Sequence, residues 1–202
     1  MEGRRLPGPV EAILLETAGA ADVDYDLVER HRRGDPRAFE DLYHRFSAMI
    51  YNLALRLCGS PEDAADVTQE VFLRVYRHLD GFRARSSLKT WIYQIGLNHC
   101  RSRYARRPPP ARPLAEDGAE GVAPLRDPAP GPEALAQASE TAARVRAALA
   151  GMDETFREAV VLRDLEGLEY AEIAAVLGVR LGTVRSRIAR GRERLRQALE
   201  GA

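Results

Sequence analysis

The chain has 202 residues, of which 45% are hydrophobic and 30% are charged. Such fractions are typical of globular proteins, so they exclude an intrinsically disordered chain and predict one ordinary domain or two small ones. No stretch approaches the roughly 20 apolar residues that cross a bilayer, and the N-terminus lacks the pattern of a secretion signal. We therefore expect a cytoplasmic protein.

The charges sum to zero, with thirty basic and thirty acidic residues, but they are unevenly distributed. Residues 101–107 contain four arginines and no acid, and residues 179–202 contain seven arginines and two glutamates. Acidic residues are concentrated between residues 62 and 70. This separation predicts basic surfaces for nucleic-acid phosphates and an acidic surface for a basic protein partner.

Patterns typical of catalysis or metal binding are missing from the sequence. The two cysteines, Cys58 and Cys100, form no CxxC pair, the four histidines have no partner constellation, and there is no glycine-rich phosphate loop. We expect no catalytic residue, no metal and no cofactor. The cysteines are expected to pack as reduced thiols, with a redox role as the less favoured alternative.

Residues 1–24 are predicted to form a weakly specified tail, and residues 25–107 a helical module. Asp35 followed by Pro36 starts one amphipathic helix, and Ser60 followed by Pro61 starts a second helix that runs to about Gly81. A third helix is expected over residues 88–104 from its apolar periodicity. No alternating strand pattern bounded by hairpin turns is present, so the module should be all-α.

Residues 108–132 contain eight of the chain's twelve prolines, which predicts an extended and mobile linker. A second module over residues 133–202 is expected to begin with helices near 133–150 and 153–165. A short helix over residues 170–177, a turn at Gly178 and a last helix capped by Thr183 are typical of a helix-turn-helix. The predicted fold is therefore all-α, with two small helical domains joined by a proline-rich flexible linker, the second a helix-turn-helix.

The helix after Ser60 carries polar groups on the side away from its apolar stripe. Asp63 is followed one turn later by Asp66, and then by Gln69 and Glu70. DNA would be repelled by these groups, whereas a basic protein surface would pair with them. The favourable interaction of acids with a helix N-terminus explains Asp63 adequately but not the later residues.

The helix over residues 88–104 interleaves aromatic, amide and guanidinium groups, which is typical of binding to single-stranded nucleic acid. Trp91, like Phe82 before it, is as well explained by core packing as by stacking on a base. Asn98 and Arg101, followed by Arg103, are harder to explain by packing. We therefore expect these three residues, together with Trp91, to contact bases or phosphates of a single strand.

The last helix is the expected recognition helix of the helix-turn-helix. Near its start lie Thr183, Arg185, Ser186, Arg187 and Arg190. An arginine fork can donate two hydrogen bonds to guanine in the major groove, while Arg187 is better suited to phosphates. The competing interpretation is a solvated basic face with no ligand, which the preceding turn makes less favoured.

Several segments resemble the extracytoplasmic-function (ECF) sigma factors of RNA polymerase, within the sigma-70 family. Residues 63–72 (DAADVTQEVF), 76–82 (YRHLDGF) and 88–98 (LKTWIYQIGLN) resemble region 2, and residues 149–154 (LAGMDE), 170–178 (YAEIAAVLG) and 182–190 (GTVRSRIAR) resemble region 4. The chain departs from the family pattern in two places. Its linker is richer in proline, and Leu181 stands where the family often has proline or a polar residue. These departures leave the path of the linker and the start of the recognition helix open.

The resemblance implies a non-catalytic transcription initiation factor that binds core RNA polymerase, directs it to promoters and helps melt them. The helix with Asp66, Gln69 and Glu70 would dock on the clamp helices of the polymerase's largest subunit. The second module would meet the flap of the second-largest subunit, and the linker would run toward the RNA exit path. An anti-sigma factor is a further expected partner, and no membrane insertion is expected.

The resemblance also implies two kinds of DNA contact. The segment around Asn98 would capture a base flipped from the non-template strand of the minus-ten element. This minus-ten single-strand site would comprise Trp91, Asn98, Arg101 and Arg103. The side chains of Arg185, Ser186 and Arg190 would read the minus-thirty-five element as duplex. The main alternative is a stand-alone helix-turn-helix regulator that binds an operator as a dimer, and a hydrolase or metalloenzyme is a third class that the sequence disfavours.

Overall fold

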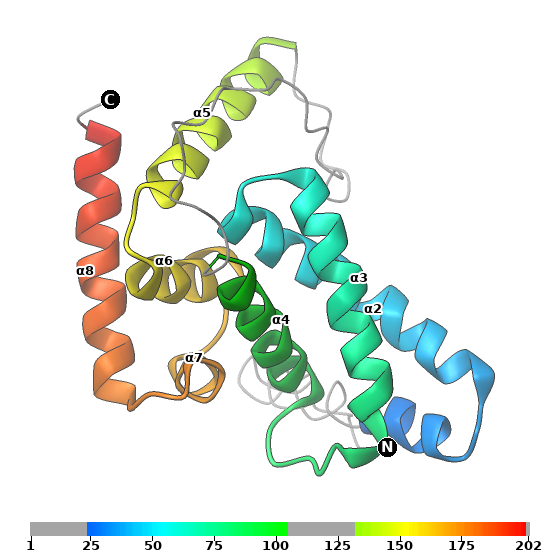
Figure 1. Ribbon diagram of the computed structural model, residues 1–202. Helices are drawn as coiled ribbons and strands as arrows, with labels where there is room; N and C mark the ends of the chain where they lie inside the picture. Colours follow the sequence, from blue (N-terminus) through cyan, green and yellow to red (C-terminus); the bar gives the residue numbers. More distant parts are fainter. Residues whose placement is uncertain (1–23, 105–131, 201–202) are drawn as a thin grey trace, which may run out of the picture.

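The computed structural model describes residues 24–104 and 132–200, and every regular element within those ranges is helical. A helix over residues 24–32 precedes α2 (Pro36–Cys58), α3 (Pro61–His78), a 3-10 turn (Leu79–Gly81) and α4 (Leu88–Tyr104). These elements form the first module. The second module contains α5 (Pro132–Ala150), α6 (Glu154–Val160), a π-helical continuation (Val161–Leu165), α7 (Tyr170–Leu177) and α8 (Leu181–Glu200) (Figure 1).

The predicted all-α fold of two small helical domains is confirmed. The predicted tail and linker lie, apart from their last residues, outside the described ranges. No helix in the described ranges is long and apolar enough to span a bilayer.

Local signals in the sequence set the helix starts of the first module. The Asp35 carboxylate accepts a hydrogen bond of 2.9 Å from the Arg37 amide, and Pro36 occupies the first helical position of α2. Ser60 Oγ accepts a hydrogen bond of 3.3 Å from the Asp63 amide and caps α3 in the same way. Gly59 ends α2 with a φ of 79°, in the left-handed region that favours glycine.

The core of the first module is built from the inward faces of α2, α3 and α4, as the apolar periodicity predicted. These faces bury Leu42, Phe46, Val67, Val71, Val75, Ile92 and Leu97. Tyr43, which falls on the same apolar periodicity of α2, is an exception, because it is 41% exposed. The polar side of α3 and the C-terminal half of α4 are thereby held on one rigid scaffold.

In the second module, α7 and α8 form the predicted helix-turn-helix. The Glu172 side chain accepts a hydrogen bond from the Glu169 amide at the start of α7, and Gly178 ends the helix with a φ of 67°. Val184 and Ile188 of α8 are buried against the rest of the module. The opposite side of α8 therefore faces outward.

One prediction about the recognition helix is wrong. Thr183 was expected to cap it, but α8 already begins at Leu181. The carbonyl of Arg180 accepts hydrogen bonds from the amides of Thr183 (2.9 Å) and Val184 (3.1 Å), so Thr183 lies inside the first turn. Leu181, Gly182 and Thr183 adopt helical conformation, which lengthens the helix by nearly one turn.

The close packing of α8 on α6 depends on Gly191. A Cβ atom at this position would lie 2.5 Å from Val160 Cγ2 and 3.1 Å from the Phe156 carbonyl oxygen. Overpacking of this kind costs about 1–3 kcal/mol, which the better helix propensity of alanine offsets by about 1 kcal/mol. The Gly191→Ala variant should therefore lose up to about 2 kcal/mol of unfolding free energy in urea titrations.

Gly182 of the same helix is the matched control. A Cβ atom there has no described heavy atom within 4 Å, so Gly182→Ala should be neutral or stabilising. Equal stability changes in the two variants would contradict the packing assigned to Gly191.

The two modules lie side by side, with α6 and α7 of the second module facing α4 of the first (Figure 1). The C-terminal end of α2 also lies against the second module, where it contacts α5 and the π-helical segment.

Candidate nucleic-acid and protein interfaces

The arginines of α8 fall into two groups that the sequence alone does not separate. In the C-terminal half, Arg192 is paired with Asp164 (2.9 Å), Arg194 with Asp153, and Arg196 with Glu193 and Glu200. In the N-terminal half, no ion pair within the described ranges involves the exposed Arg185 and Arg190 or the half-buried Arg187. The cationic groups near the helix start are therefore available to an anionic ligand.

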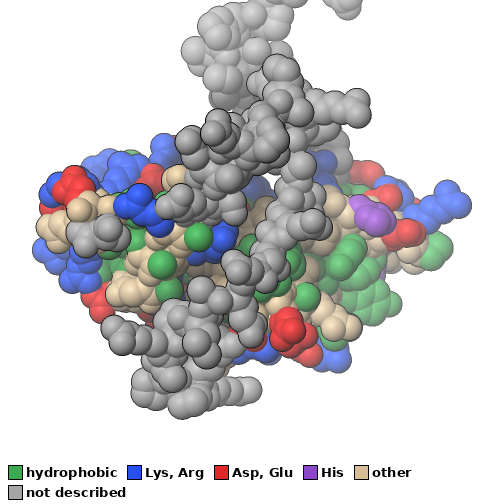
Figure 2. All heavy atoms as spheres, turned by 90° about the horizontal axis from the view of Figure 1, so that it is seen from above, with side chains coloured by type: hydrophobic (Ala, Val, Ile, Leu, Met, Phe, Trp, Pro, Cys, Tyr) green, Lys and Arg blue, Asp and Glu red, His purple; other side chains and the backbone are tan. Residues whose placement is uncertain are grey.

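The turn from α7 to α8 sets which side chains face outward. Val184 and Ile188 point into the module, so Arg185, Ser186 and Arg190 are exposed on the opposite side. Ser186 Oγ donates a hydrogen bond of 3.0 Å to the Thr183 carbonyl, and Thr183 itself is half-buried. Figure 2, seen from above Figure 1, faces the C-terminal end of α8, where Lys and Arg side chains (blue) lie among Asp and Glu side chains (red).

The polar face of α3 is open at Gln69 and Glu70. Both side chains are exposed, and neither makes a hydrogen bond or ion pair with any other described residue. Asp66 is also exposed, but its carboxylate accepts a hydrogen bond of 3.1 Å from Arg103 Nη2. The acidic surface therefore consists of one paired and one unpaired carboxylate beside an amide.

Asp63 is not part of the exposed polar face of α3, on which the sequence analysis placed it. Its side chain is buried and accepts a hydrogen bond of 2.7 Å from Arg103 Nη2. The same arginine nitrogen reaches both Asp63 and Asp66, so it joins α4 to the first two turns of α3. In this structure Arg103, predicted to bind DNA, and Asp63, predicted to bind polymerase, are partners of each other.

An apolar patch continues the polar face of α3. Leu73 and Tyr76 lie four and seven residues after Gln69, and both are exposed. The Tyr76 ring packs edge-on against Phe39 with centroids 4.9 Å apart, and the exposed Tyr43 ring packs in the same way against Phe72. The sequence analysis did not predict that Leu73, Tyr76 and Tyr43 lie on the surface. Leu73 and Tyr76 could have been found, because spacings of four and seven residues place them on the same helix face as Gln69.

The candidate residues on α4 differ in how far their side chains are exposed to solvent. Asn98 is exposed, while Trp91 is half-buried with its ring 5.3 Å from that of Phe82. Phe82 is itself buried, which favours the packing interpretation for this residue. Asn98 is thus the residue of this group most open to a ligand.

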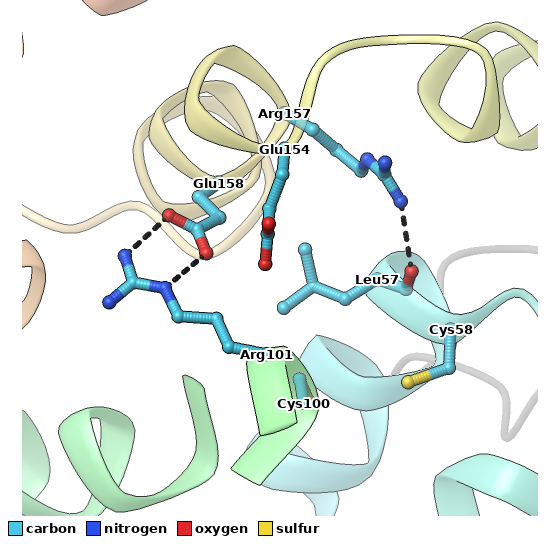
Figure 3. A pocket seen from close by; sticks show the side chains of 7 residues that line it. All are labelled: Leu57, Cys58, Cys100, Arg101, Glu154, Arg157 and Glu158. Atoms are coloured by element: carbon cyan, nitrogen blue, oxygen red, sulfur yellow. Dashed lines mark hydrogen bonds and ion pairs between the residues drawn. The ribbon is translucent and has the colours of Figure 1, made fainter. Parts of the chain in front are cut away.

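Arg101 is held by the second module. Its Nε and Nη2 atoms each donate a hydrogen bond of 2.6 Å to the two carboxylate oxygens of Glu158 on α6 (Figure 3). The hydrogen bond with Glu158 raises the pKa of Arg101 above its ordinary value, so the guanidinium stays charged. Arg101 was predicted to contact the minus-ten strand. In this structure its guanidinium is already bound to the Glu158 carboxylate.

Comparisons with known proteins bear on both modules. Residues 42–108 match the family model of sigma-70 region 2, and residues 142–195 match that of sigma-70 region 4. The chain is 40% identical to the RNA polymerase sigma-H factor of Pseudomonas aeruginosa over 88% of its own length and 94% of that protein. It is 38% identical to the ECF RNA polymerase sigma-E factor of Escherichia coli K12, over 84% and 91% of the two chains.

The chain belongs to the ECF sigma factors of the sigma-70 family. It is a transcription initiation factor that directs RNA polymerase to promoters. The presence of both regions in one chain disfavours the alternative of a stand-alone helix-turn-helix regulator.

Solved structures agree with the fold of this sigma factor. CnrH, in a structure titled as its complex with the cytosolic domain of CnrY, has a TM-score of 0.66 at 28% identity, covering 88% of this chain and 97% of CnrH. RpoE of Bartonella quintana, solved with the anti-sigma factor NepR, has a TM-score of 0.61 at 23% identity, covering 81% and 98% of the two chains. The second likeness shows the fold alone.

The two cysteines of the sigma factor lie beside the contact between the modules. Cys58 and Cys100 line a small pocket together with Leu57, Arg101, Glu154, Arg157 and Glu158 (Figure 3). A hydrogen bond with Cys58 and burial of the side chain raise the pKa of the Cys100 thiol, which disfavours its thiolate form. This environment favours packing over a redox role.

Proposed function

We propose that the sigma factor divides its work between an acidic surface for the polymerase and two separate basic surfaces for promoter DNA. Residues 25–107 carry polymerase binding and minus-ten recognition, and residues 133–202 carry minus-thirty-five recognition, with residues 108–132 as the linker. The chain acts in the cytoplasm as a non-catalytic specificity subunit. The observation that carries the proposal is the division of α8 into an unpaired, exposed arginine group near its start and a neutralised group near its end.

The polymerase surface combines a polar and an apolar half. Gln69 and Glu70, with Asp66 beside them, orient a basic partner such as the clamp helices of the largest subunit. The neighbouring Leu73 and Tyr76 supply apolar area, and buried aromatic residues commonly contribute most of the binding energy at protein interfaces. Asp63 supports this surface from within, because its buried carboxylate positions Arg103. In the second module, the flap of the second-largest subunit is the proposed polymerase contact.

At the minus-thirty-five element, the start of α8 enters the major groove. Arg185 and Arg190 donate hydrogen bonds to base edges, and Ser186 adds a further polar contact. Thr183 and the half-buried Arg187 meet the phosphates and fix the register of the helix on the duplex. The paired arginines of the C-terminal half stabilise the module itself.

At the minus-ten element, α4 traps an unpaired base. Asn98 contacts the base edge, Trp91 offers part of its ring for stacking, and Arg101 and Arg103 meet the backbone. Promoter melting needs no hydrolysis in this scheme, because capture of the flipped base offsets an unpairing cost of a few kcal/mol.

The two DNA contacts are individually weak and gain strength when one scaffold holds both of them. Once the first contact forms, the linker and the polymerase raise the effective concentration of the second. Free sigma factor should therefore bind promoters poorly. An anti-sigma protein that covers these surfaces is the proposed regulatory partner, and the relative CnrH has been solved in complex with a cytosolic domain of another protein.

The test compares promoter binding by the free chain and by the chain mixed with core RNA polymerase. We expect stable association with core enzyme and tight binding to promoter fragments only in the mixture, measured by gel filtration and by electrophoretic mobility shift. Tight and specific DNA binding by the chain alone, without association with core enzyme, would instead support a stand-alone regulator and overturn the proposal.

A further inference from the structure

The recognition helix begins with an exposed leucine. Leu181 is the first residue of α8 and is 40% exposed. Val184, the next apolar residue of the helix, is fully buried one turn later. Both direct neighbours of Leu181, Arg180 and Gly182, are exposed as well. The leucine side chain therefore lies just beyond the edge of the module's core, among polar and bare backbone groups.

Exposure alone does not make a leucine functional, because single apolar residues are common on protein surfaces. Leu165 of the same module is 38% exposed and lies at the end of the π-helical segment, where its carbonyl accepts a hydrogen bond from Arg56. The two leucines differ in their place in the fold. Leu181 lies in the first turn of the helix that the proposed function inserts into the major groove, and Leu165 does not.

The surroundings of Leu181 suit close approach to a duplex. Arg185 follows four residues later, so it lies one turn along on the same side of α8, and it is exposed without an ion pair among the described residues. A Cβ atom at Gly182 would have no described heavy atom within 4 Å. In Figure 1 the start of α8 lies beside α7, away from α5. An apolar side chain, open backbone and a guanidinium thus adjoin at this end of the helix.

The chemistry of the major groove determines what a leucine can recognise there. A recognition helix presents its N-terminal residues to the base edges. The base edges in this groove carry hydrogen-bond donors and acceptors, and the C5-methyl group of thymine is the apolar exception. Leucine offers no hydrogen bond, so packing it against a donor or acceptor would remove water without replacing it. Contact with a thymine methyl group instead buries two apolar surfaces together.

We infer that Leu181 is a specificity-determining residue of the minus-thirty-five contact, and that it packs against the C5-methyl group of a thymine close to the base read by Arg185. The inference rests on the proposed function, in which the start of α8 enters the major groove, and adds an apolar contact to it. Leu181 selects a base by this contact, whereas the arginines select bases by hydrogen bonds. The two kinds of recognition can therefore be separated by experiment.

The test uses holoenzyme made from core polymerase and the full-length chain. Promoter fragments come from start sites mapped by runoff transcription, and each thymine of the minus-thirty-five element, in either strand, is replaced in turn by deoxyuridine. Deoxyuridine lacks only the methyl group. Competition binding of the wild-type holoenzyme should show a loss of about three- to fourfold at one of these thymines or more, which is the factor expected for burial of one methyl group.

Three variants assign the methyl effect to its residue. Leu181→Ala should bind the thymine and deoxyuridine fragments equally, because the side chain no longer reaches the methyl group. Leu181→Met keeps an apolar side chain of similar size and should retain most of the difference. Leu165→Ala is the matched control, because it makes the same change at a leucine of nearly equal exposure in the same module, and it should keep the wild-type ratio. Circular dichroism confirms equal helix content in all four proteins.

Two results would overturn the inference. One is the lack of any thymine at which deoxyuridine weakens binding of the wild type. The other is a methyl effect of the same size in Leu181→Ala as in the wild type. Arg190→Ala on the same fragments separates these results from failure of the proposed function. If Arg190→Ala loses base discrimination while the methyl group has no effect, only the role of Leu181 fails; if neither change affects binding, the proposed reading of the duplex by α8 fails as well.

Discussion

Replacing Gln69 and Glu70 together by alanine should weaken binding to core RNA polymerase by about tenfold or more, because the central polar contacts of an interface often cost more than 1 kcal/mol when truncated. Both side chains are exposed and make no hydrogen bond or ion pair with other described residues, so their loss should not disturb the fold. Fluorescence titration of labelled sigma factor with core enzyme measures the effect.

The control for this double variant is Asp26→Ala. Asp26 is also an exposed acid of the first module, and its replacement removes the same single negative charge. Its affinity for core enzyme should match that of the wild type. An equal loss in both proteins would show that polymerase binding responds to net charge and not to this face of α3.

Replacing Arg190 by alanine should reduce promoter selectivity while leaving polymerase affinity unchanged. A bidentate arginine–guanine contact is worth about 1–3 kcal/mol of discrimination, which corresponds to a loss of roughly 5- to 150-fold. Competition between a cognate and a scrambled minus-thirty-five duplex for the holoenzyme measures the ratio directly.

Arg196→Ala provides the comparison on the same helix. Arg196 is neutralised by Glu193 and Glu200, which also raise its pKa through their hydrogen bonds with it. We expect its replacement to leave the selectivity ratio at the wild-type value. A fall in selectivity as large as that of Arg190→Ala would contradict the assignment of base contacts to the start of α8.

Most of the fold was predictable because its determinants are local. The Asp35–Pro36 and Ser60–Pro61 pairs specify helix starts through side-chain caps, and Gly178 permits the left-handed turn that separates α7 from α8. The start of α8 lies three residues before the predicted one, at Leu181 instead of Val184. Thr183 is a good capping residue, but helix capping competes with continued helix formation upstream, and Leu181 and Gly182 accept the helical conformation.

The site residues were less predictable because their availability depends on distant partners. Nothing in the run of arginines on α8 shows that Arg192 meets Asp164, twenty-eight residues away, whereas Arg190 meets no described acid. Likewise, Asp63 and Arg103 were assigned to different ligands, although they lie forty residues apart in sequence and bind each other. Charge pairing between residues far apart in the sequence is a property of the tertiary structure and leaves no periodic signal.

As a sigma factor, this chain should choose where RNA polymerase begins transcription. Runoff transcription with core polymerase and genomic DNA, with start sites mapped by sequencing the 5′ ends of the transcripts, measures this choice. We predict that adding the purified chain produces a new and limited set of start sites that core enzyme alone does not use. Identical start sites with and without the chain would show that it does not select promoters.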